Sequence, residues 1–308
     1  MKNKKSIVFI GSSCIDEYYE MDHMPDLGDK VILKPLESKV GGMIANAAAV
    51  ASSYGMETYL MDVISKSDYN QMLEDDLKEY NIKLDMIRYD ATLPDAKCLI
   101  FLKDGERIVW VIPTQKKDVE VDDEQKRILE KAEYVYTSLE ELRRFKDRKG
   151  FMSWLHQINT KIVVDVEWIN EENMEEAWDS ISHSDIIFVN SEGDEQLSKC
   201  IADDYTKQLT DRGCLVIKTK GAEGCEVYTT DGENWSCPAY KVIPVDTTGA
   251  GDTFNSSFVY GLSCGWGLQE AGTFANAAAG RAILNMGARS GAVGEAAVKD
   301  FMNREGTK

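Results

Sequence analysis

The segment from Val245 to Phe254 carries the densest group of residues suited to chemistry, in the order Val-Asp-Thr-Thr-Gly-Ala-Gly-Asp-Thr-Phe. An extended apolar lead-in reaches Val245, and a helical pattern starts near Asp252. Gly249 and Gly251 lie between them, and glycines ahead of a helix let the backbone approach a ligand closely. The helix dipole adds about half a positive charge at that end. The segment therefore predicts an anion site built from backbone N–H groups, without a lysine.

Asp252 places a carboxylate in the first turn of that helix, beside the predicted anion site. A carboxylate there is positioned to take a proton from a hydroxyl group, the task of the base in phosphoryl transfer. Taken alone, the same residues could be a tight turn capped by Asp252. Two other nucleotide-binding classes do not fit, because the segment after the first apolar run lacks the Gly-x-Gly-x-x-Gly spacing of dehydrogenases and the chain has no Walker-type Gly-x-x-x-x-Gly-Lys-[Ser/Thr] loop.

Short apolar runs alternate with helical stretches along most of the chain. Buried strands are predicted at 6–10, 58–63, 134–137, 162–165, 186–190 and 215–218, and helices at 44–54 and 68–80. This alternation predicts an α/β fold in three α/β/α layers, with a mostly parallel central sheet covered by helices on both faces.

Two regions break that alternation. Residues 15–39 contain a Pro25/Gly28 turn between extended stretches, and 95–112 predict a hairpin that turns at 103–106. Together they predict a small β-sheet that covers one edge of the core as a lid. The expected core is 1–11, 41–88 and 113–308, and the expected lid is 12–40 and 89–112.

Composition excludes several classes of partner. The chain has 308 residues and a formal net charge of −18, and such a surface repels nucleic acid and anionic membranes. The chain has seven cysteines, an odd number, and no Cys-x-x-Cys motif. This pattern favours reduced thiols over a disulfide framework or a zinc site. The apolar run Ile7–Ile10 is too short for a signal peptide, so we expect a cytoplasmic protein.

The order and rough spacing of several motifs resemble the ribokinase-like (PfkB-type) carbohydrate kinases over nearly the whole chain. Asp-Thr-Thr-Gly-Ala-Gly-Asp at 246–252 is similar to the signature of that family almost letter for letter. The other similar segments are 11–16, Val40-Gly41-Gly42-Met43-Ile44-Ala45-Asn46, 104–107, 218–224, 276–279 and 287–288. The resemblance implies a ribokinase-like fold with a β-sheet lid, ATP as phosphoryl donor and Mg²⁺ arriving with it.

The same resemblance implies roles for individual residues. Asp252 would be the base, and the N–H groups of Gly249, Ala250 and Gly251 would form the anion hole. Acceptor contacts are implied at Asp16, Gly41, Gly42, Asn46 and Glu140, although Glu140 could equally be a solvated residue of a first helical turn. Nucleotide contacts are implied at Asn190, Thr219, Gly221, Gly224 and Asn276, and a monovalent cation such as K⁺ at Asp246 and Thr248.

Three positions depart from the pattern of the family. Met43 and Ile44 follow the glycine pair where lysine and glycine are usual, which makes a phosphorylated sugar less suitable and a base or bulkier aglycone more so. Gly193 replaces a glutamate that supports the magnesium waters, with Glu192, Asp194 and Glu195 as substitutes. No arginine follows Asp165-Val166-Glu167-Trp168, where the family often has one.

The sequence therefore favours an ATP-dependent kinase that acts on a hydroxyl of a small sugar, and it leaves two alternatives open. One is a nucleoside kinase of the same family, with lid aromatics such as Tyr18, Tyr19 and Trp110 stacked on the base. The other is a relative that binds a ligand without turnover. We also expect a homodimer that pairs through one apolar lid face, comprising Val31, Leu33, Leu99, Phe101, Val109 and Val111.

Overall fold

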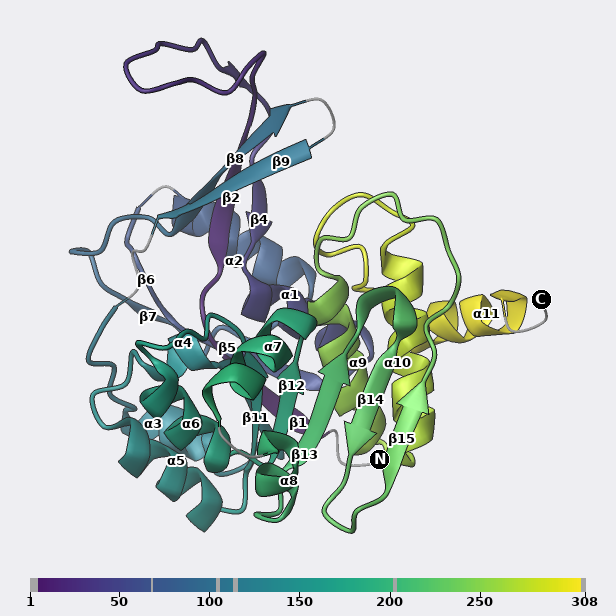
Figure 1. Cartoon of the computed structure of the whole chain (residues 1–308). Helices are drawn as coiled ribbons and strands as arrows, with labels where there is room; N and C mark the ends of the chain where they lie inside the picture. The colour runs from purple at the N-terminus through teal and green to yellow at the C-terminus, as the bar shows by residue number, and fades with distance from the viewer. Residues whose placement is uncertain (1–4, 68, 104–105, 113–115, 202–203, 306–308) are drawn as a thin grey trace.

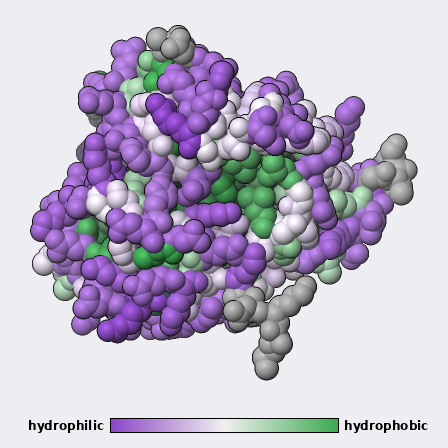
Figure 2. Space-filling model, turned by 90° about the horizontal axis from the view of Figure 1, so that it is seen from below, coloured by the Kyte–Doolittle hydropathy of each residue, from purple (hydrophilic) through white to green (hydrophobic). Residues whose placement is uncertain are grey.

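The computed structural model describes residues 5–67, 69–103, 106–112, 116–201 and 204–305. Asp104 and Gly105 of the predicted lid turn lie outside these residues. Among the described residues, no helix is long and apolar enough to cross a membrane. Figure 2 shows that the lower face of the molecule is mostly hydrophilic, with the largest hydrophobic area near its centre and smaller ones elsewhere.

An eight-stranded sheet forms the centre of the molecule, in the order β15-β14-β13-β12-β11-β10-β1-β5 (Figure 1). Its strands are β1 (Ser6–Ile10), β5 (Glu57–Met61), β10 (Tyr134–Ser138), β11 (Lys161–Val166), β12 (Ile186–Val189), β13 (Leu215–Thr219), β14 (Cys225–Tyr228) and β15 (Asn234–Cys237). All neighbouring pairs are parallel except β13–β14 and β14–β15. The predicted strands are confirmed. Their signal was clear because parallel strands are buried on both faces and therefore appear in the sequence as continuous apolar runs.

Helices cover both faces of this sheet, which confirms the three layers. Ile7 and Phe9 of β1 pack into one apolar core beneath α1, α9, α10 and α11, while Val8 and Ile10 pack into a second core beneath α3 to α8. The helices are α1 (Met43–Ser53), α2 (Tyr69–Glu79), α3 (Asp123–Leu129), α4 (Leu139–Leu142), α5 (Arg148–Gln157), α6 (Met174–Ser182), α7 (Ser191–Cys200), α8 (Tyr205–Thr210), α9 (Ala250–Ser263), α10 (Leu268–Ala282) and α11 (Glu295–Glu305), with a short 3₁₀ turn at Gly221–Glu223.

A second sheet of five strands stands apart from the large one, above it in Figure 1. It consists of β2 (Cys14–Glu20), β3 (Lys34–Pro35), β4 (Lys39–Gly41), β8 (Lys97–Lys103) and β9 (Glu106–Ile112). Gly41, the last residue of β4, falls within the range predicted for the core. Two further strands, β6 (Val63–Ile64) and β7 (Arg88–Tyr89), pair beside the core.

The register of the lid hairpin corrects the predicted apolar face. Leu99 pairs with Trp110 and Phe101 with Ile108, whereas Val109 pairs with Ile100. Directly paired residues lie on the same face of a sheet, so Val109 and Val111 lie on the face opposite to Leu99 and Phe101. The face that carries Phe101 borders a cavity of about 190 Å³ that is also lined by Met21, Val31, Leu33, Ile108 and Trp110.

The chain before Gly249 does not form the strand-like segment that was expected. Residues 238–249 form no strand, and Val245 is held by a hydrogen bond from its N–H to the carbonyl of Ile283, at 2.7 Å. The side chains of Ile243 and Val245 are largely exposed. Pro244 has no N–H to give to a strand ladder, which explains why this apolar stretch stays outside the sheet.

Candidate active site

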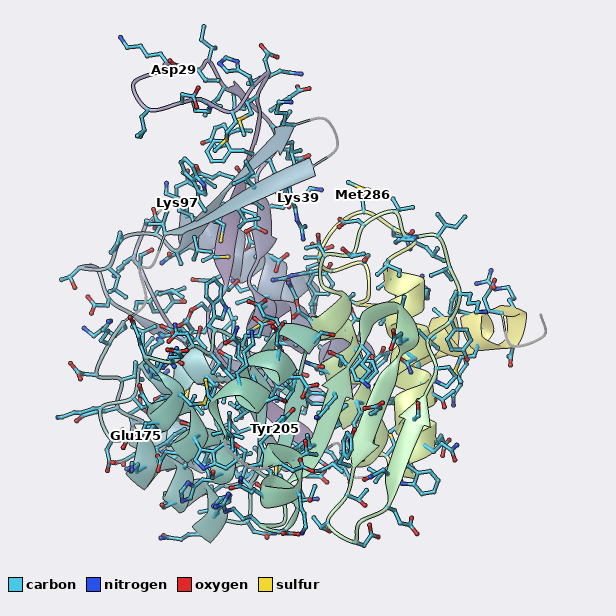
Figure 3. All side chains as sticks on the ribbon, in the orientation of Figure 1. Asp29, Lys39, Lys97, Glu175, Tyr205 and Met286 are labelled. Atoms are coloured by element: carbon cyan, nitrogen blue, oxygen red, sulfur yellow. The ribbon has the colours of Figure 1, made fainter. Side chains whose placement is uncertain are left out.

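The predicted site residues other than Glu140 lie near the carboxyl edge of the large sheet, where the direction of strand order changes. β1 lies between β5 and β10, and such switch points are where open α/β sheets bind ligands. Asn190 follows β12, and Thr219 ends β13 at the same edge. The lid and the loop before α11 face each other across an opening of about 680 Å³, which Lys39 and Met286 border from the two sides (Figure 3).

Asp252 lies in the first turn of α9 and is buried. Its Oδ2 accepts a hydrogen bond from Nδ2 of Asn46 at 3.0 Å. Burial raises the pKa of the Asp252 carboxyl to about 7; the charge of Glu167 adds to this rise, while the bond from Asn46 and the charge of Arg289 oppose it. A carboxyl group with this pKa can exchange a proton near neutral pH, as a general base must.

Asn46 connects the carboxylate to a residue that the sequence argument missed. Its Oδ1 accepts a hydrogen bond from Nε of Arg289 at 3.2 Å, so both ends of its amide are fixed. Arg289 is nearly buried and also pairs with Asp76 of α2. Its Nη2 is buried without a hydrogen-bond partner in the described part of the chain. A buried donor without a partner is costly, and an acceptor atom of a ligand would satisfy it.

Two glycines make room for Asp16 and for the start of α1. A Cβ on Gly41 would lie 2.2 Å from Oδ2 of Asp16, so only glycine allows the carboxylate to sit there. Gly42 has φ 103°, and a Cβ there would lie 2.5 Å from the carbonyl oxygen of Ser12. Burial raises the pKa of Asp16, while hydrogen bonds from Cys14 and Cys98 and the charge of Arg289 oppose the rise.

The glycine turn before α9 has the geometry expected of an anion site. Gly249 is left-handed, with φ 74°, and is the residue before the first helical turn. A Cβ on it would lie 2.0 Å from the carbonyl oxygen of Ala288, whereas a Cβ on Gly251 would meet nothing within 4 Å. The N–H of Ala250 makes only a long bond of 3.3 Å to Thr247. The first N–H groups of a helix have no partner within it, so these donors can serve an anion.

Asp246 fastens this turn to the loop before α11. Its Oδ1 accepts from the N–H of Thr248 at 2.9 Å, and its Oδ2 accepts from the N–H of Gly287 at 2.9 Å. Burial raises the pKa of Asp246, but these hydrogen bonds outweigh it and hold the pKa below its ordinary value. Arg107 of the lid binds Oγ1 of Thr248 and lies 3.9 Å from Asp246. A guanidinium group therefore approaches the two residues predicted to hold a monovalent cation.

The predicted nucleotide residues lie around the ends of β12 to β15. Asn190 caps α7, where its Oδ1 accepts from the N–H of Gly193 at 2.8 Å. Gly221 has φ 53° and open space around its Cβ position, and Gly224 has φ 102° against the carbonyl oxygen of Cys237. Asn276 is buried in α10, and its Nδ2 donates to the carbonyl of Cys237 at 2.8 Å. Asn276 thus anchors the loop after β15.

Glu140 does not join the cluster. Its side chain is 56% exposed and pairs with Arg143 at 2.8 Å. The next residue, Glu141, is buried and accepts hydrogen bonds from the N–H and hydroxyl of Ser12 at 3.0 and 2.9 Å. One step along a helix turns a side chain by about 100°, so the prediction for Glu140 is not supported by this arrangement.

Carboxylates also gather at the place where the family glutamate is missing. Gly193 is buried, and a Cβ there would lie 3.0 Å from the carbonyl oxygen of Val166, which leaves little room for a side chain. Glu192 lies near Glu167, and the pKa of Glu167 is raised by burial and by the charge of Glu192. Asp194 is instead engaged by Lys218 at 2.8 Å. Glu195 pairs with Lys199 at 2.5 Å. Of the three suggested substitutes, Glu192 is therefore the one beside Glu167.

A buried polar network around Asp165, also missed from sequence, lies next to the helix that carries Asp252. Oδ2 of Asp165 accepts hydrogen bonds from Tyr136 at 3.1 Å and from Asn255 at 2.9 Å. Burial, together with the charges of Glu167 and Asp252, raises the pKa of Asp165 well above its ordinary value. Asn255 lies one turn after Asp252 in α9, so the network links β10 and β11 to the helix that carries Asp252.

Comparison with known proteins identifies the family to which this chain belongs. Residues 4–293 match the family model of the pfkB family carbohydrate kinases. The chain is 24% identical to a ribokinase of Bacillus subtilis, over 93% of this chain and 96% of the relative, and 23% identical to a nucleoside kinase of Methanocaldococcus jannaschii, over 89% of each. The fold matches that of an Arabidopsis thaliana ribokinase solved with ribose and ATP, with a TM-score of 0.81, 20% identity, and coverage of 97% of this chain and 98% of the other. The chain therefore belongs to the pfkB family of carbohydrate kinases.

Proposed function

We propose that this kinase transfers the γ-phosphoryl group of ATP to a hydroxyl of a small sugar or sugar derivative, with Asp252 as the base. The observation that carries the proposal is the buried Asp252 carboxyl, with its pKa raised to about 7, in the first helical turn after the Gly249 anion site. Base and anion site come from one turn of chain, so their relative position is fixed. Most of the rate enhancement in phosphoryl transfer comes from such positioning and charge stabilisation.

In the proposed reaction, Asp16 and Asn46 hold hydroxyls of the acceptor, because carboxylate and amide oxygens accept hydrogen bonds from them. Asp252 takes the proton of the reacting hydroxyl while the hydroxyl oxygen bonds to the γ-phosphorus. The bond from that phosphorus to the bridging oxygen breaks, and ADP leaves with the electron pair. N–H groups of the Gly249–Gly251 turn stabilise the negative charge on the transferring phosphoryl oxygens.

On the donor side, we propose that Thr219, Gly221 and Gly224 border the nucleotide and that Asn190 and Asn276 hold the loops around it. Mg²⁺ bound to ATP would neutralise phosphate charge and keep several of its waters. Glu167 and Glu192 form a carboxylate pair suited to accept hydrogen bonds from those waters. The predicted K⁺ at Asp246 and Thr248 stays a prediction, and Arg107 brings a fixed positive charge to the same two residues.

The alternative of a nucleoside acceptor is supported by one aromatic residue of the three that the sequence suggested. Tyr18 is two residues from Asp16 along β2 and so lies on the same face of the lid. Tyr19 stacks on Phe101 and Trp110 packs edge-on against Phe101, which places both on the other face. A nucleobase next to Asp16 would therefore meet Tyr18.

The test is ADP release across a panel of ribose, fructose, 2-keto-3-deoxygluconate, adenosine and inosine. We expect one sugar to turn over, with ADP and phosphorylated product formed in equal amounts. Turnover of the nucleosides alone would establish the alternative. If no compound turns over while a ligand still raises the melting temperature, the chain binds its ligand without transferring phosphate, and the proposal fails.

The rate should follow ionisation of Asp252. The base must be deprotonated, so kcat/KM for the acceptor is expected to rise about tenfold per pH unit below pH 7 and to level above it, since the pKa of Asp252 is about 7. The measurement is the pH profile at saturating ATP between pH 5.5 and 9. A flat profile through pH 7 would contradict this assignment.

Substitution of Arg289 should shift this pH profile while Asp252 itself is unchanged. Its positive charge lowers the pKa of Asp252, so Arg289→Gln should shift the acidic limb to higher pH and raise KM for the acceptor. Arg289→Lys keeps the charge but loses the forked contacts, so it should raise KM and leave the limb in place. Arg281→Gln is the matched control, because Arg281 bonds the same loop at the carbonyl of Ser290. If the acidic limb of the pH profile stayed in place in Arg289→Gln, the proposed effect of Arg289 on the pKa of Asp252 would be contradicted.

A further inference from the structure

Two thiols flank the proposed acceptor carboxylate on the lid. Sγ of Cys14 lies 3.9 Å from Sγ of Cys98 and 3.7 Å from Oδ1 of Asp16. The ligand atoms of all three residues lie within 4.8 Å of one another, and all three side chains are only partly buried. No other group of three such ligands is found in the described part of the chain.

The strand register brings these residues together. Cys14 and Asp16 are two residues apart on β2 and so lie on one face of the lid sheet. Cys98 of β8 pairs directly with Asp16 in the parallel ladder. Side chains carried by paired strands hold their spacing better than side chains on loops, so the cluster is formed before any ligand arrives.

The spacing suits a tetrahedral dication. Zinc–thiolate bonds of about 2.3 Å at tetrahedral angles place two sulfur atoms about 3.8 Å apart, close to the 3.9 Å between Cys14 and Cys98. A thiolate sulfur and a carboxylate oxygen on the same ion would be about 3.5 Å apart, against the 3.7 Å from Cys14 to Asp16. We propose that Cys14, Asp16 and Cys98 form a binding site for Zn²⁺ or a similar thiophilic dication.

Three protein ligands leave one tetrahedral position for water or another donor, as in zinc sites that are not purely structural. Thiolate ligands select against Mg²⁺ and K⁺, which prefer oxygen, so this site is separate from the metal that accompanies ATP. Occupancy would take the Asp16 carboxylate away from the acceptor. Zn²⁺ should therefore inhibit competitively with the acceptor sugar, and this half of the proposal rests on the proposed function.

The other close pair of thiols lacks a carboxylate and serves as an internal comparison. Cys225 and Cys237 face each other across β14 and β15 and are buried, with Asn276 as their polar neighbour. Cys264 is exposed at the end of α9 and provides a matched control for the loss of a surface thiol.

The binding test uses Co²⁺ as a spectroscopic probe on the reduced full-length chain under argon. We expect one Co²⁺ per chain with a near-ultraviolet thiolate-to-cobalt absorption band, and displacement of that band by one equivalent of Zn²⁺. Cys14→Ser and Cys98→Ser should each abolish the band, and Cys264→Ser should keep it. An absent band, or one that survives in both Cys14→Ser and Cys98→Ser, overturns the site.

The second measurement is inhibition of the ATP-dependent reaction. Zn²⁺ should raise KM for the acceptor at unchanged kcat in the wild type and in Cys264→Ser, and should lose this effect at least tenfold in Cys98→Ser. Binding without competition would overturn the inhibitory half of the proposal and the role of Asp16. The cobalt spectrum does not depend on turnover, so failure of the site and failure of the kinase proposal are distinguished.

Discussion

Replacing Asp252 with asparagine is expected to lower kcat by about a hundredfold to ten-thousandfold, the usual range for loss of a general base. The substitution keeps the shape of the side chain, and the remaining amide oxygen can still accept the bond from Asn46 that Oδ2 accepts in the wild type, at 3.0 Å. The loss should therefore fall on kcat, with KM for the acceptor changed little. Steady-state kinetics with the substrate found in the panel measure both.

The same variant should melt at a higher temperature than the wild type at pH 8. The folded-state pKa of Asp252 is raised to about 7, so its ionised form is disfavoured in the native protein and costs stability above the pKa of the unfolded chain. This cost grows as pH rises from about 4 to 7 and then levels. The advantage of Asp252→Asn should accordingly be smaller at pH 5 than at pH 8.

Asp211→Asn provides the control, because Asp211 is an exposed carboxylate paired with Lys207 on α8. It should leave both kcat and the pH dependence of melting unchanged. If Asp252→Asn kept activity within about threefold of the wild type, the assignment of the base would fail. A lower melting temperature at pH 8 would contradict the account of its raised pKa.

The sequence predicts the layers because their signals are local. Ile7–Ile10 is an unbroken apolar run and lies in a strand that is buried on both faces, and the glycine turn before α9 is a contiguous motif. Arg289 carries no such signal, since its partner Asn46 lies 243 positions away in the chain. Only the packing of α1 against α9 and the last loop brings the two together.

The facing of side chains is harder to predict than their spacing, as the lid hairpin and Glu140 show. The lid hairpin pairs Lys103 with Glu106, so odd-numbered residues of β8 face even-numbered residues of β9. The predicted apolar face combined odd residues from both strands and was therefore half wrong. In the same way, Glu140 and Glu141 differ by one step of a helix, which leaves Glu140 in solvent and Glu141 against Ser12. The period of a strand or helix predicts which residues share a face, but it does not predict which face turns inward.

Gly249→Ala should damage both stability and catalysis. The new Cβ would lie 2.0 Å from the carbonyl oxygen of Ala288, a backbone atom that cannot swing aside, and φ 74° adds about 1–2 kcal/mol of left-handed strain. The turn must move, and the loop that carries Arg289 moves with it. Misplacement by about 1 Å can cost a hundredfold in rate. We expect that loss in kcat, with a lower free energy of unfolding in denaturant titration.

Gly265→Ala separates the two causes. Gly265 has φ 80°, close to that of Gly249, but a Cβ there would meet nothing within 4 Å. Gly265→Ala should therefore lose only about 1–2 kcal/mol of folding stability, from left-handed strain. It should keep full activity, since Gly265 lies at the far end of α9. If the two variants lost equal stability and Gly249→Ala kept its kcat, contact with Ala288 would not define the turn. A larger loss at Gly249 in both measurements would establish that close packing against the backbone of Ala288, beyond the conformational freedom of glycine, holds the proposed anion site next to Asp252.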